Sequence, residues 1–480
     1  MPDQGDSFIQ PETGHRITRI SDIKDSFFSN LEGDSASGLT NGYSRFTCSN
    51  IDDEYVFAYS TEQSILVYEL PECRFLKELT YDGIHFIGES NDPRWDMSGR
   101  QGTETTIYYN VDTGIYKKDV LKGYSSRELV YDFNQNIVPE DHMDQDKYAR
   151  YRAVRFPNEI VVLDLRQKKI LPGKINVSYG GCDMSTEGDW LYVQGFGEYE
   201  METRFYKTRD LEQGLTNNYV VLPCRNHGHD GWAYDYDGNE VYTFQDNTND
   251  WFSTFNPVTG ERMDILHMSE TGWEFGQHMG RIHNLNKKGW LLMSSYTWTD
   301  SRWADNQIFL LEILPHNQTP RIWRIASTHN SWDGDYFAEA FASISGDGNS
   351  IYWGANWMGQ NNLELYRVEL PPNWHQVLSP DAYIIYPVQN LSGRQVLNRS
   401  LFQAEYINVL SWEPHPNNKN ISSCRIYNIT RNSPVLLDEI PAGTYEFHHR
   451  DVDKNQSYSY MATAVDEKGN ESFPTFITVE

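Results

Sequence analysis

The sequence lacks the features that mark several familiar classes of protein. Its five cysteines are scattered, odd in number and without a Cys-X-X-Cys pair, which argues against a disulfide framework and against a zinc knuckle. No apolar run approaches the roughly 20 residues that a membrane span needs. The polar start at Met1 shows no signal peptide. We therefore expect a cytoplasmic protein or, if a leader has been removed, an extracellular or periplasmic one.

Positive charge is also scarce, with 40 Lys and Arg residues against 68 Asp and Glu residues and a formal net charge of −28. A field of that sign repels phosphate backbones and anionic lipid surfaces, so we expect neither a nucleic-acid partner nor a membrane partner. Phosphate-binding loops, serine-nucleophile motifs and redox cysteine pairs are absent, which disfavours phosphoryl and hydride transfer.

Aromatic residues and short β-type runs are abundant instead. Aromatic residues make up 14% of the chain, enough for a large core, and no long stretch shows helical periodicity. One hairpin pattern, a polar turn followed by a strand rich in Tyr, Trp, Val and Ile, recurs along the chain and starts at Ser49, Met184, Tyr234, Asn284 and Ile344. The middle three copies are spaced by about 50 residues, the length of one four-stranded propeller blade.

Two weaker hairpin units, from Asp92 and Lys147, bring the blade count to seven. The sequence thus predicts an all-β fold: an N-terminal tail over 1–21, a seven-bladed β-propeller over 22–374 and a small sandwich over 380–480. The last segment resembles a fibronectin type III domain, with Trp412 as its core tryptophan. Its inner face would be lined by Tyr458, Tyr460 and Ala464.

Histidines cluster in the segments that precede the innermost strands of three successive blades. Such segments line the central channel of a propeller, where several blades direct side chains at one point. His227 and His229 alternate by two, so they share one face of a strand and suit two ligands on one metal ion. The same position in the next two blades holds a set of polar residues: Gln277, His278, Arg281, His283, His329, Asn330, Tyr336 and Glu339.

Each of these residues also has a purely structural interpretation. A single histidine at a propeller strand often only hydrogen-bonds the neighbouring blade, and we regard that as the more common case for any one of them. Convergence of imidazoles, a carboxylate and a guanidinium favours a site for the group as a whole. The tryptophans in the long loops are either blade core or platforms for sugar rings, and these are Trp273, Trp298, Trp303 and Trp332.

From about Gly42 to Trp374 the chain resembles bacterial seven-bladed propellers of the oligogalacturonate lyase type. The resemblance rests on three runs: His229-Asp230 before one hairpin, His278 before the next, and Thr328-His329 followed by Tyr336, Glu339 and Asn356-Trp357. It implies a metal held on the central face with a nearby His or Arg, and cleavage of uronate-containing glycans. Ulvan lyases are similar propellers that use His, Tyr and Arg. Gln277, His278 and His283 depart from the closely spaced Gln-His-His metal run of the first family.

The resulting hypothesis is a polysaccharide lyase that cleaves beside a uronic acid by β-elimination, with a polysaccharide or oligosaccharide as its partner. Such a reaction needs a cation or hydrogen-bond donor for the C6 carboxylate, a base for the C5 proton and an acid for the leaving oxygen. Arg281 or a divalent ion (manganese, calcium or zinc) would meet the carboxylate. The base would be His227 or His283, and the acid Tyr336.

The remaining roles in this hypothesis are assigned by position. The metal ligands would be His229, His278, His329 and Glu339, and the substrate-binding residues would be Gln277, Asn330, Asn356 and Trp357. Two alternatives stay open: a non-catalytic propeller that binds glycan or protein, and a glycoside hydrolase that uses Asp230 and Glu339 as its carboxylate pair.

Overall fold

The structure is a computed structural model of residues 1–480. It describes all of them except 11–12, 27–37, 61–63, 80–92, 138–143, 178–180, 197–201, 226–228, 272–275, 299–301, 316–317, 319, 333, 360–361, 378–386, 400–403, 417, 419–420, 430–434, 455, 468–471, 473–474 and 480. The chain forms two compact units, one of residues 1–5 and 17–372 and one of residues 6–16 and 373–480.

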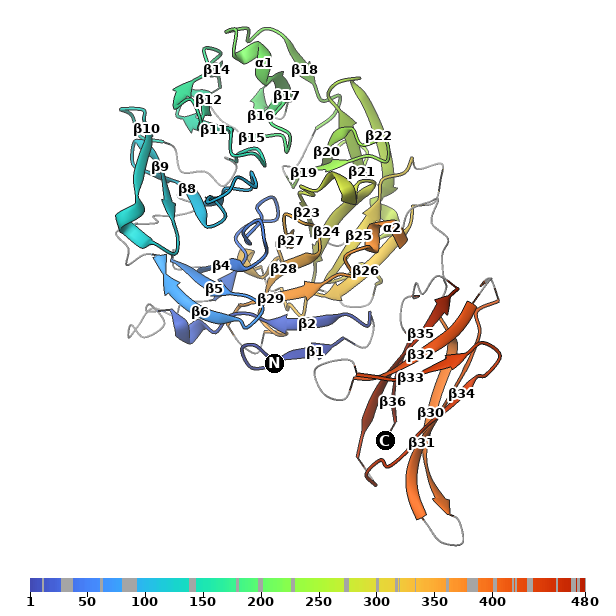
Figure 1. Ribbon diagram of the computed structural model, residues 1–480. Helices are drawn as coiled ribbons and strands as arrows, with labels where there is room; N and C mark the ends of the chain where they lie inside the picture. Colours follow the sequence, from blue (N-terminus) through green and yellow to red (C-terminus); the bar gives the residue numbers. More distant parts are fainter. Residues whose placement is uncertain are drawn as a thin grey trace. The chain divides into compact units, whose positions relative to one another are not determined.

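Seven antiparallel sheets in the described residues of the first unit are arranged around a centre (Figure 1). The first three sheets consist of β3 (Leu39–Thr40), β4 (Tyr55–Ser60), β5 (Ile65–Glu69) and β6 (Arg74–Glu78); of β7 (Arg94–Trp95), β8 (Thr106–Val111), β9 (Gly114–Asp119) and β10 (Glu128–Asp132); and of β11 (Tyr151–Phe156), β12 (Glu159–Asp164), β13 (Lys169–Ile170) and β14 (Ile175–Asn176).

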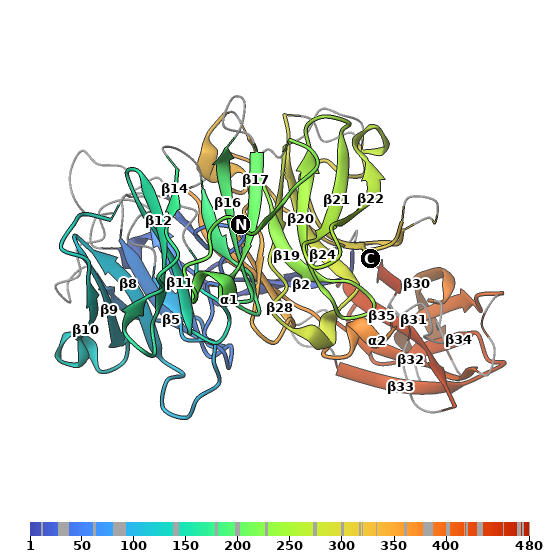
Figure 2. The same cartoon turned by 90° about the horizontal axis from the view of Figure 1, so that it is seen from above.

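The next three sheets follow the same plan, with their strands side by side in Figure 2 as well. They consist of β15 (Cys182–Met184), β16 (Trp190–Phe196), β17 (Glu202–Lys207) and β18 (Tyr219–Val221); of β19 (Gly231–Tyr234), β20 (Glu240–Asp246), β21 (Trp251–Asn256) and β22 (Glu261–His267); and of β23 (Gly276–Gly280), β24 (Trp290–Tyr296), β25 (Gln307–Glu312) and β26 (Ile322–Ser327).

The last sheet joins the two ends of the propeller chain. It contains β27 (Ser343–Ile344), β28 (Ser350–Ala355), β29 (Glu364–Glu369) and, from the N-terminal region, β2 (Arg16–Arg19) and β1 (Ser7–Ile9), in the order β1-β2-β29-β28-β27. In β2, Ile17 pairs with Val368, and the buried Arg19 binds Glu364 at 2.7 Å. The sequence predicts a tail here, because a strand of four residues with two arginines shows little apolar pattern. The structure uses them to close the ring.

Helical segments between these strands are short. They are α1 (Thr208–Leu211) and the 3-10 turns η1 (Ile23–Asp25), η5 (Gly123–Ser126), η7 (Met268–Glu270), η8 (Leu285–Lys287) and η9 (Tyr336–Ala338). None of the helices in the described part of the chain is long and apolar enough to cross a membrane.

The predicted all-β propeller with seven blades is confirmed. Each of the five recurring hairpins supplies the second strand of a blade. Four of their turns use glycine at positive φ, as at Gly188 (φ 79°) and Gly348 (φ 76°), and the first uses Asp53 (φ 57°). Apolar side chains from these strands are buried between neighbouring blades; Phe57 of β4, for example, stacks on Trp95 of β7 with ring centroids 4.2 Å apart.

The second unit is a sandwich of two sheets. One sheet has the order β30-β31-β34 and the other β33-β32-β35-β36. Its elements are α2 (Trp374–Val377), β30 (Gln389–Arg399), β31 (Ala404–Glu413), β32 (Ile421–Asn428), β33 (Val435–Pro441), β34 (Glu446–His449), β35 (Tyr458–Asp466) and β36 (Thr475–Val479). The predicted core residues Trp412, Tyr458, Tyr460 and Ala464 are all buried in one apolar cluster. The predicted boundaries at 374 and 380 stay predictions.

If β2 closes the ring, shortening its one buried apolar side chain should weaken the propeller. We expect Ile17→Ala to lower the free energy of unfolding by about 2–4 kcal/mol, because the side chain is fully enclosed beside β29. Thr18→Ala in the same strand, whose side chain is half-buried, is the control and should change it by less than about 1 kcal/mol. Equal losses in urea unfolding would contradict this role of β2.

Candidate functional site

The innermost strands run in the same direction along the channel. His229, just before β19, bonds to Gln277 near the start of β23, and Trp232 within β19 bonds to Ile282 just after β23. The channel therefore has one end at which these strands begin and one at which they finish. We refer to these as the strand-start end and the strand-finish end.

Buried ion pairs occupy the middle of the channel. The guanidinium of Arg281, which follows β23, pairs with Asp144 at 3.0 Å and with Asp183 on β15. It also donates to the carbonyl oxygen of Met184 at 2.9 Å. Burial raises the pKa of Asp183, and the charge of Arg281 opposes that rise because it stabilises the carboxylate.

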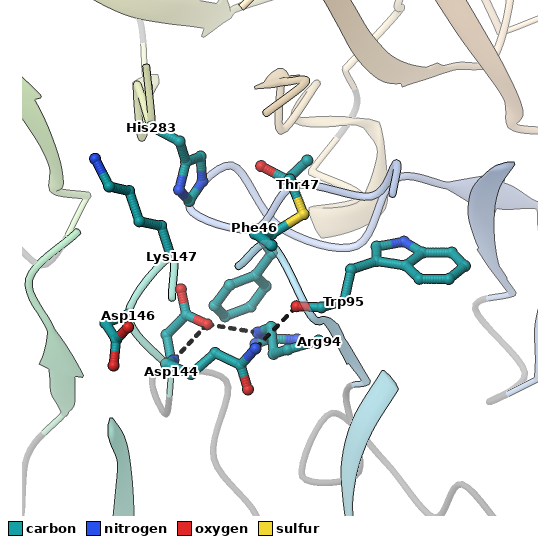
Figure 3. A pocket seen from close by; sticks show the side chains of 10 residues that line it. Phe46, Thr47, Arg94, Trp95, Asp144, Asp146, Lys147 and His283 are labelled. Atoms are coloured by element: carbon teal, nitrogen blue, oxygen red, sulfur yellow. Dashed lines mark hydrogen bonds and ion pairs between the residues drawn. The ribbon is translucent and has the colours of Figure 1, made fainter. Parts of the chain in front are cut away.

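Two more arginines extend this network to other blades. Arg94 on β7 binds the other oxygen of Asp144 at 2.9 Å, a contact drawn in Figure 3, and lies over the ring of Phe46. Arg45 binds Asp230 at 2.6 Å, and both side chains are almost fully enclosed. We name these six residues, Arg45, Arg94, Asp144, Asp183, Asp230 and Arg281, the channel network.

The channel network corrects two of the sequence hypotheses. Arg281 was expected to neutralise the carboxylate of a substrate, but its side chain is completely enclosed and already paired with two carboxylates. Asp230 was a candidate for one of two hydrolytic carboxylates, but it is bound by Arg45 and by the hydroxyl of Tyr242. Neither group is placed to meet a glycan.

A second cluster lies at the strand-start end, around His278. Nε2 of His278 lies 2.9 Å from Oε2 of Glu339, and the buried Tyr296 at the end of β24 bonds the same carboxylate. The ring of His229 stacks on His278 with centroids 4.3 Å apart. Burial, and then the charge of Glu339, raise the pKa of Tyr296. We name His229, His278, Tyr296 and Glu339 the imidazole cluster.

The turn η9 presents Glu339 and Tyr336 at this cluster. Asp335 caps the turn by accepting a hydrogen bond from the backbone of Phe337 at 3.1 Å, which fixes where Tyr336 and Glu339 emerge. Tyr336 is 37% exposed, and its ring lies 4.9 Å from that of Phe341. Phe341 in turn lies 4.5 Å from His278, so Tyr336 is separated from the imidazole cluster by one ring.

Two tryptophans next to the imidazole cluster form an aromatic surface. Trp298 is 72% exposed, and its ring lies 4.1 Å from that of Trp332. Trp332 contacts Tyr296 edge-on at 4.9 Å, so the stack leads from solvent to the carboxylate of Glu339. Of the other loop tryptophans, Trp303 donates to the carbonyl of Glu270, and Trp273 lies outside the described residues.

The loop that carries Trp332 is held by two asparagines. Asn330 donates to the carbonyl of Gly354 at 3.0 Å and accepts from the backbone of Asn356 at 2.7 Å. Asn356 bonds the backbone of Ser331 through both its oxygen and its nitrogen. We predicted that both asparagines bind substrate; the structure engages their amides in backbone bonds that position the loop.

The other predicted site residues are spread more widely. His329 stacks on Trp357 at 4.5 Å, and no described contact links it to His278. Gln277 is buried and donates to Gln245 at 3.0 Å. His283 follows β23 and lines a pocket at the strand-finish end, away from His278. His227 lies outside the described residues.

The described residues do not fit the predicted metal centre. His278 and Glu339 bond each other, His229 uses Nδ1 on the carbonyl of Gln277 at 2.7 Å, and His329 stands apart. No group of three or more His, Cys, Asp or Glu side chains in the described part of the chain is arranged to hold an ion. The divalent ion therefore stays a prediction from the sequence.

Two residues of this site were not found from the sequence. Tyr296 closes the run Leu-Leu-Met-Ser-Ser-Tyr of a recurring hairpin and read as blade core. Tyr43, whose ring lies 5.3 Å from His278, precedes a hairpin by several residues and shows no pattern of its own. Because paired strands are antiparallel, the end of a blade's second strand lies beside the start of its innermost strand, as Tyr296 lies beside Gly276. Applied to the sequence, this geometry would have identified Tyr296.

No family model and no curated protein matches the sequence. Solved structures do resemble the fold. An oligogalacturonate lyase from Vibrio parahaemolyticus matches with a TM-score of 0.50 and 11% identity, over 76% of this chain and 96% of its own. A chain of a mitotic checkpoint complex matches with a TM-score of 0.43 and 12% identity, over 77% and 95%. The first likeness shows a shared propeller fold, and the second score is too low to add to it.

The enclosure of Arg281 predicts a structural effect of its removal. We expect Arg281→Met to lower the free energy of unfolding by about 3–5 kcal/mol, because Asp183 and Asp144 would lose a buried counter-charge. The control is Arg74→Met, which removes a surface pair with Glu69 and should cost less than about 1 kcal/mol. If urea unfolding gave both variants the same small loss, the channel network would not hold the propeller together.

The burial of His283 predicts a dependence of stability on pH. Burial, and then the charge of Arg281, lower the pKa of this imidazole to about 3 from an ordinary value of 6.5. Between these values the unfolded chain binds a proton that the folded protein does not, so His283 destabilises the fold as pH falls below 6.5. The wild-type protein should lose unfolding free energy as the pH falls from 6 to 4. In His283→Phe this loss should be smaller, by up to about 1.4 kcal/mol per pH unit. An unchanged slope would contradict this.

Proposed function

We propose that the protein acts on a uronic-acid-containing glycan and cleaves it by β-elimination at the strand-start end of the channel. The observation that supports this most directly is the path from the exposed Trp298 through Trp332 and Tyr296 to Glu339. An exposed aromatic pair suits the apolar face of sugar rings, and the cluster behind it supplies groups for proton transfer. The shared fold with an oligogalacturonate lyase supports the substrate class as an analogy only.

His229 is the proposed base. Its Nδ1 lies 2.7 Å from the carbonyl oxygen of Gln277, which accepts only, so this nitrogen carries the proton. Nε2 is then the nitrogen with a lone pair, which is what removal of the C5 proton requires. Tyr336, exposed and one ring away, is the proposed acid for the leaving oxygen. His283, a candidate base from the sequence, lies at the strand-finish end and therefore cannot serve the imidazole cluster.

Glu339 is proposed as a positioning residue. It accepts from His278 and from Tyr296, and His278 forms the surface against which His229 stacks. The carboxylate thus fixes the orientation of the ring behind the base. Because Arg281 is enclosed, the carboxylate of the sugar would be met by hydrogen-bond donors other than that guanidinium.

A non-catalytic glycan-binding propeller is the second candidate, favoured by one specific observation. Arg281, the guanidinium expected to meet the substrate, is already paired with Asp183, and no group of metal ligands occurs in the described residues, whereas Trp298 is exposed. Binding by stacking on Trp298 needs no cation. The hydrolase alternative lacks such support, because Asp230 is held by Arg45.

We also propose that the second unit is a fibronectin type III module. Its sheets of three and four strands and its buried Trp412 have the arrangement expected of that class. Modules of this fold act mostly as spacers or adhesion domains, so we assign it no part in catalysis.

The proposed reaction is tested by incubating the protein with uronate polysaccharides such as polygalacturonate and alginate. β-Elimination gives the ultraviolet absorbance of an unsaturated uronate, and we expect His229→Ala to lower kcat about 10²–10⁴-fold because the base is lost. Glu339→Gln should lower kcat less and shift its pH profile, because it acts through His278. The control is Glu72→Gln, an exposed carboxylate away from the cluster, which should leave the rate unchanged.

Three other results would each redirect this proposal. Reducing ends without the absorbance would indicate hydrolysis. Retention on an immobilised glycan without any product, reduced severalfold by Trp298→Ala, would support the binding propeller. Full activity of a folded His229→Ala variant would rule out that imidazole as the base.

A further inference from the structure

A pocket opens at the strand-finish end of the channel, beyond the channel network (Figure 3). Its interior is about 20 Å³, room for one or two groups the size of a hydroxyl or a water, and the wider space that includes its open mouth is about 280 Å³. Four blades contribute to it, since Phe46 precedes β4, Trp95 belongs to β7, Asp146 precedes β11 and His283 follows β23. None of its lining residues belongs to the imidazole cluster, so this pocket is separate from the site proposed above.

The two sides of the pocket differ in polarity. Phe46 and Met97 form an apolar side, and His283 faces it together with the backbone run from Asp144 to Lys147. The ring of Trp95 points away from the pocket in Figure 3 and stacks on Phe57. In Figure 3 the ring of His283 extends into the space between Lys147 and Phe46. A sugar ring or another polyol also has an apolar C–H face and polar hydroxyl groups, so it complements a pocket with one apolar and one polar side.

The charged groups of the lining are already compensated. Arg94 binds Asp144, and Lys147 binds both Glu187 at 2.5 Å and the hydroxyl of Tyr234 at 3.1 Å. The carboxylate of Asp146 accepts hydrogen bonds from backbone amides, among them that of Tyr148 at 2.7 Å. The lining therefore offers no uncompensated charge that would hold an anion or a cation.

His283 is the polar group of the pocket that lacks a partner. Its side chain is nine-tenths buried, and both ring nitrogens have no hydrogen-bond partner among the described residues. Burial keeps the ring neutral, so one nitrogen donates and the other accepts. A buried polar group without a partner costs about 1–3 kcal/mol, which a ligand or water that bonds both nitrogens would recover.

We infer that this pocket is a second ligand site, which binds the hydroxyl groups of a neutral polyol, such as the end of an uncharged sugar, on His283. A hydroxyl both donates and accepts, as the neutral imidazole does, and it brings no charge beside Asp144 or Lys147. The apolar side at Phe46 and Met97 covers the C–H face of the same ligand. A uronate would place its carboxylate beside Asp144 and Asp146 and is disfavoured here.

The experiment is titration of the full chain with galactose, glucose, xylose, sorbitol and glucuronate, one at a time, by calorimetry and saturation-transfer NMR. All measurements use the Trp298→Ala variant, which removes the exposed ring of the proposed glycan surface at the strand-start end. Binding at the pocket is then tested independently of the proposed function. We expect saturable binding of at least one of the four neutral compounds, weakened at least tenfold by His283→Phe. A sugar and the open-chain sorbitol distinguish a ring ligand from a general polyol, and either supports the inference.

Two further variants keep the test decisive. Met97→Trp fills the pocket from its half-exposed side without changing His283, and should abolish the same binding even if His283→Phe does not fold. His267→Phe changes a half-buried histidine of another blade, outside the pocket lining, and should have no effect. The inference is overturned if no neutral compound binds saturably, if glucuronate alone binds, or if binding is unchanged in folded His283→Phe and Met97→Trp. The first of these outcomes would leave only water in the pocket.

Discussion

The pairing of buried charges in the channel is the constraint on which the rest of the propeller depends. A charge removed from water is tolerated only when a partner of opposite sign is held against it. Here each member of the channel network comes from a different blade, and Asp144 lies between Arg94 and Arg281. Apolar packing between blades tolerates small displacements, but these ion pairs do not. They therefore fix the register in which neighbouring blades meet.

Because the channel network fills the middle of the channel, it separates two ends with different chemistry. At the strand-start end, the imidazoles of His229 and His278 lie behind the exposed ring of Trp298. At the strand-finish end, neither ring nitrogen of His283 has a hydrogen-bond partner in the described part of the chain, and the Arg94 and Lys147 charges nearby are already paired. These differences are the basis of the two proposals, proton transfer at one end and recognition of a neutral group at the other.

Much of the polar chemistry at the strand-start end holds the site in place. Asn330 and Asn356 join the loop of Trp332 to the end of β28, and Asp335 caps the turn that presents Glu339. Such bonds are individually modest, yet they set where an aromatic ring stands relative to a carboxylate. A glycan that lies on Trp298 would therefore meet the cluster in a fixed orientation.

The sequence by itself determined the blades, because a hairpin signal is local. A residue at positive φ in the turn, usually glycine, and β-branched or aromatic residues in the following strand specify a second strand without reference to the rest of the chain, as at Gly348 and Ile351. The same holds for the core of the sandwich around Trp412. These elements follow from turn chemistry and the period of the strands.

Only the tertiary structure decided which polar residues share a site, and whether β2 belongs to the ring. Residues two to five positions apart, such as His278, Arg281 and His283, look like one cluster in sequence. An innermost strand passes through the whole channel, so it delivers them to its start, its middle and its end. Partners from other blades, Glu339 for His278 and Asp183 for Arg281, are far away in sequence, and no local pattern encodes contacts of that kind.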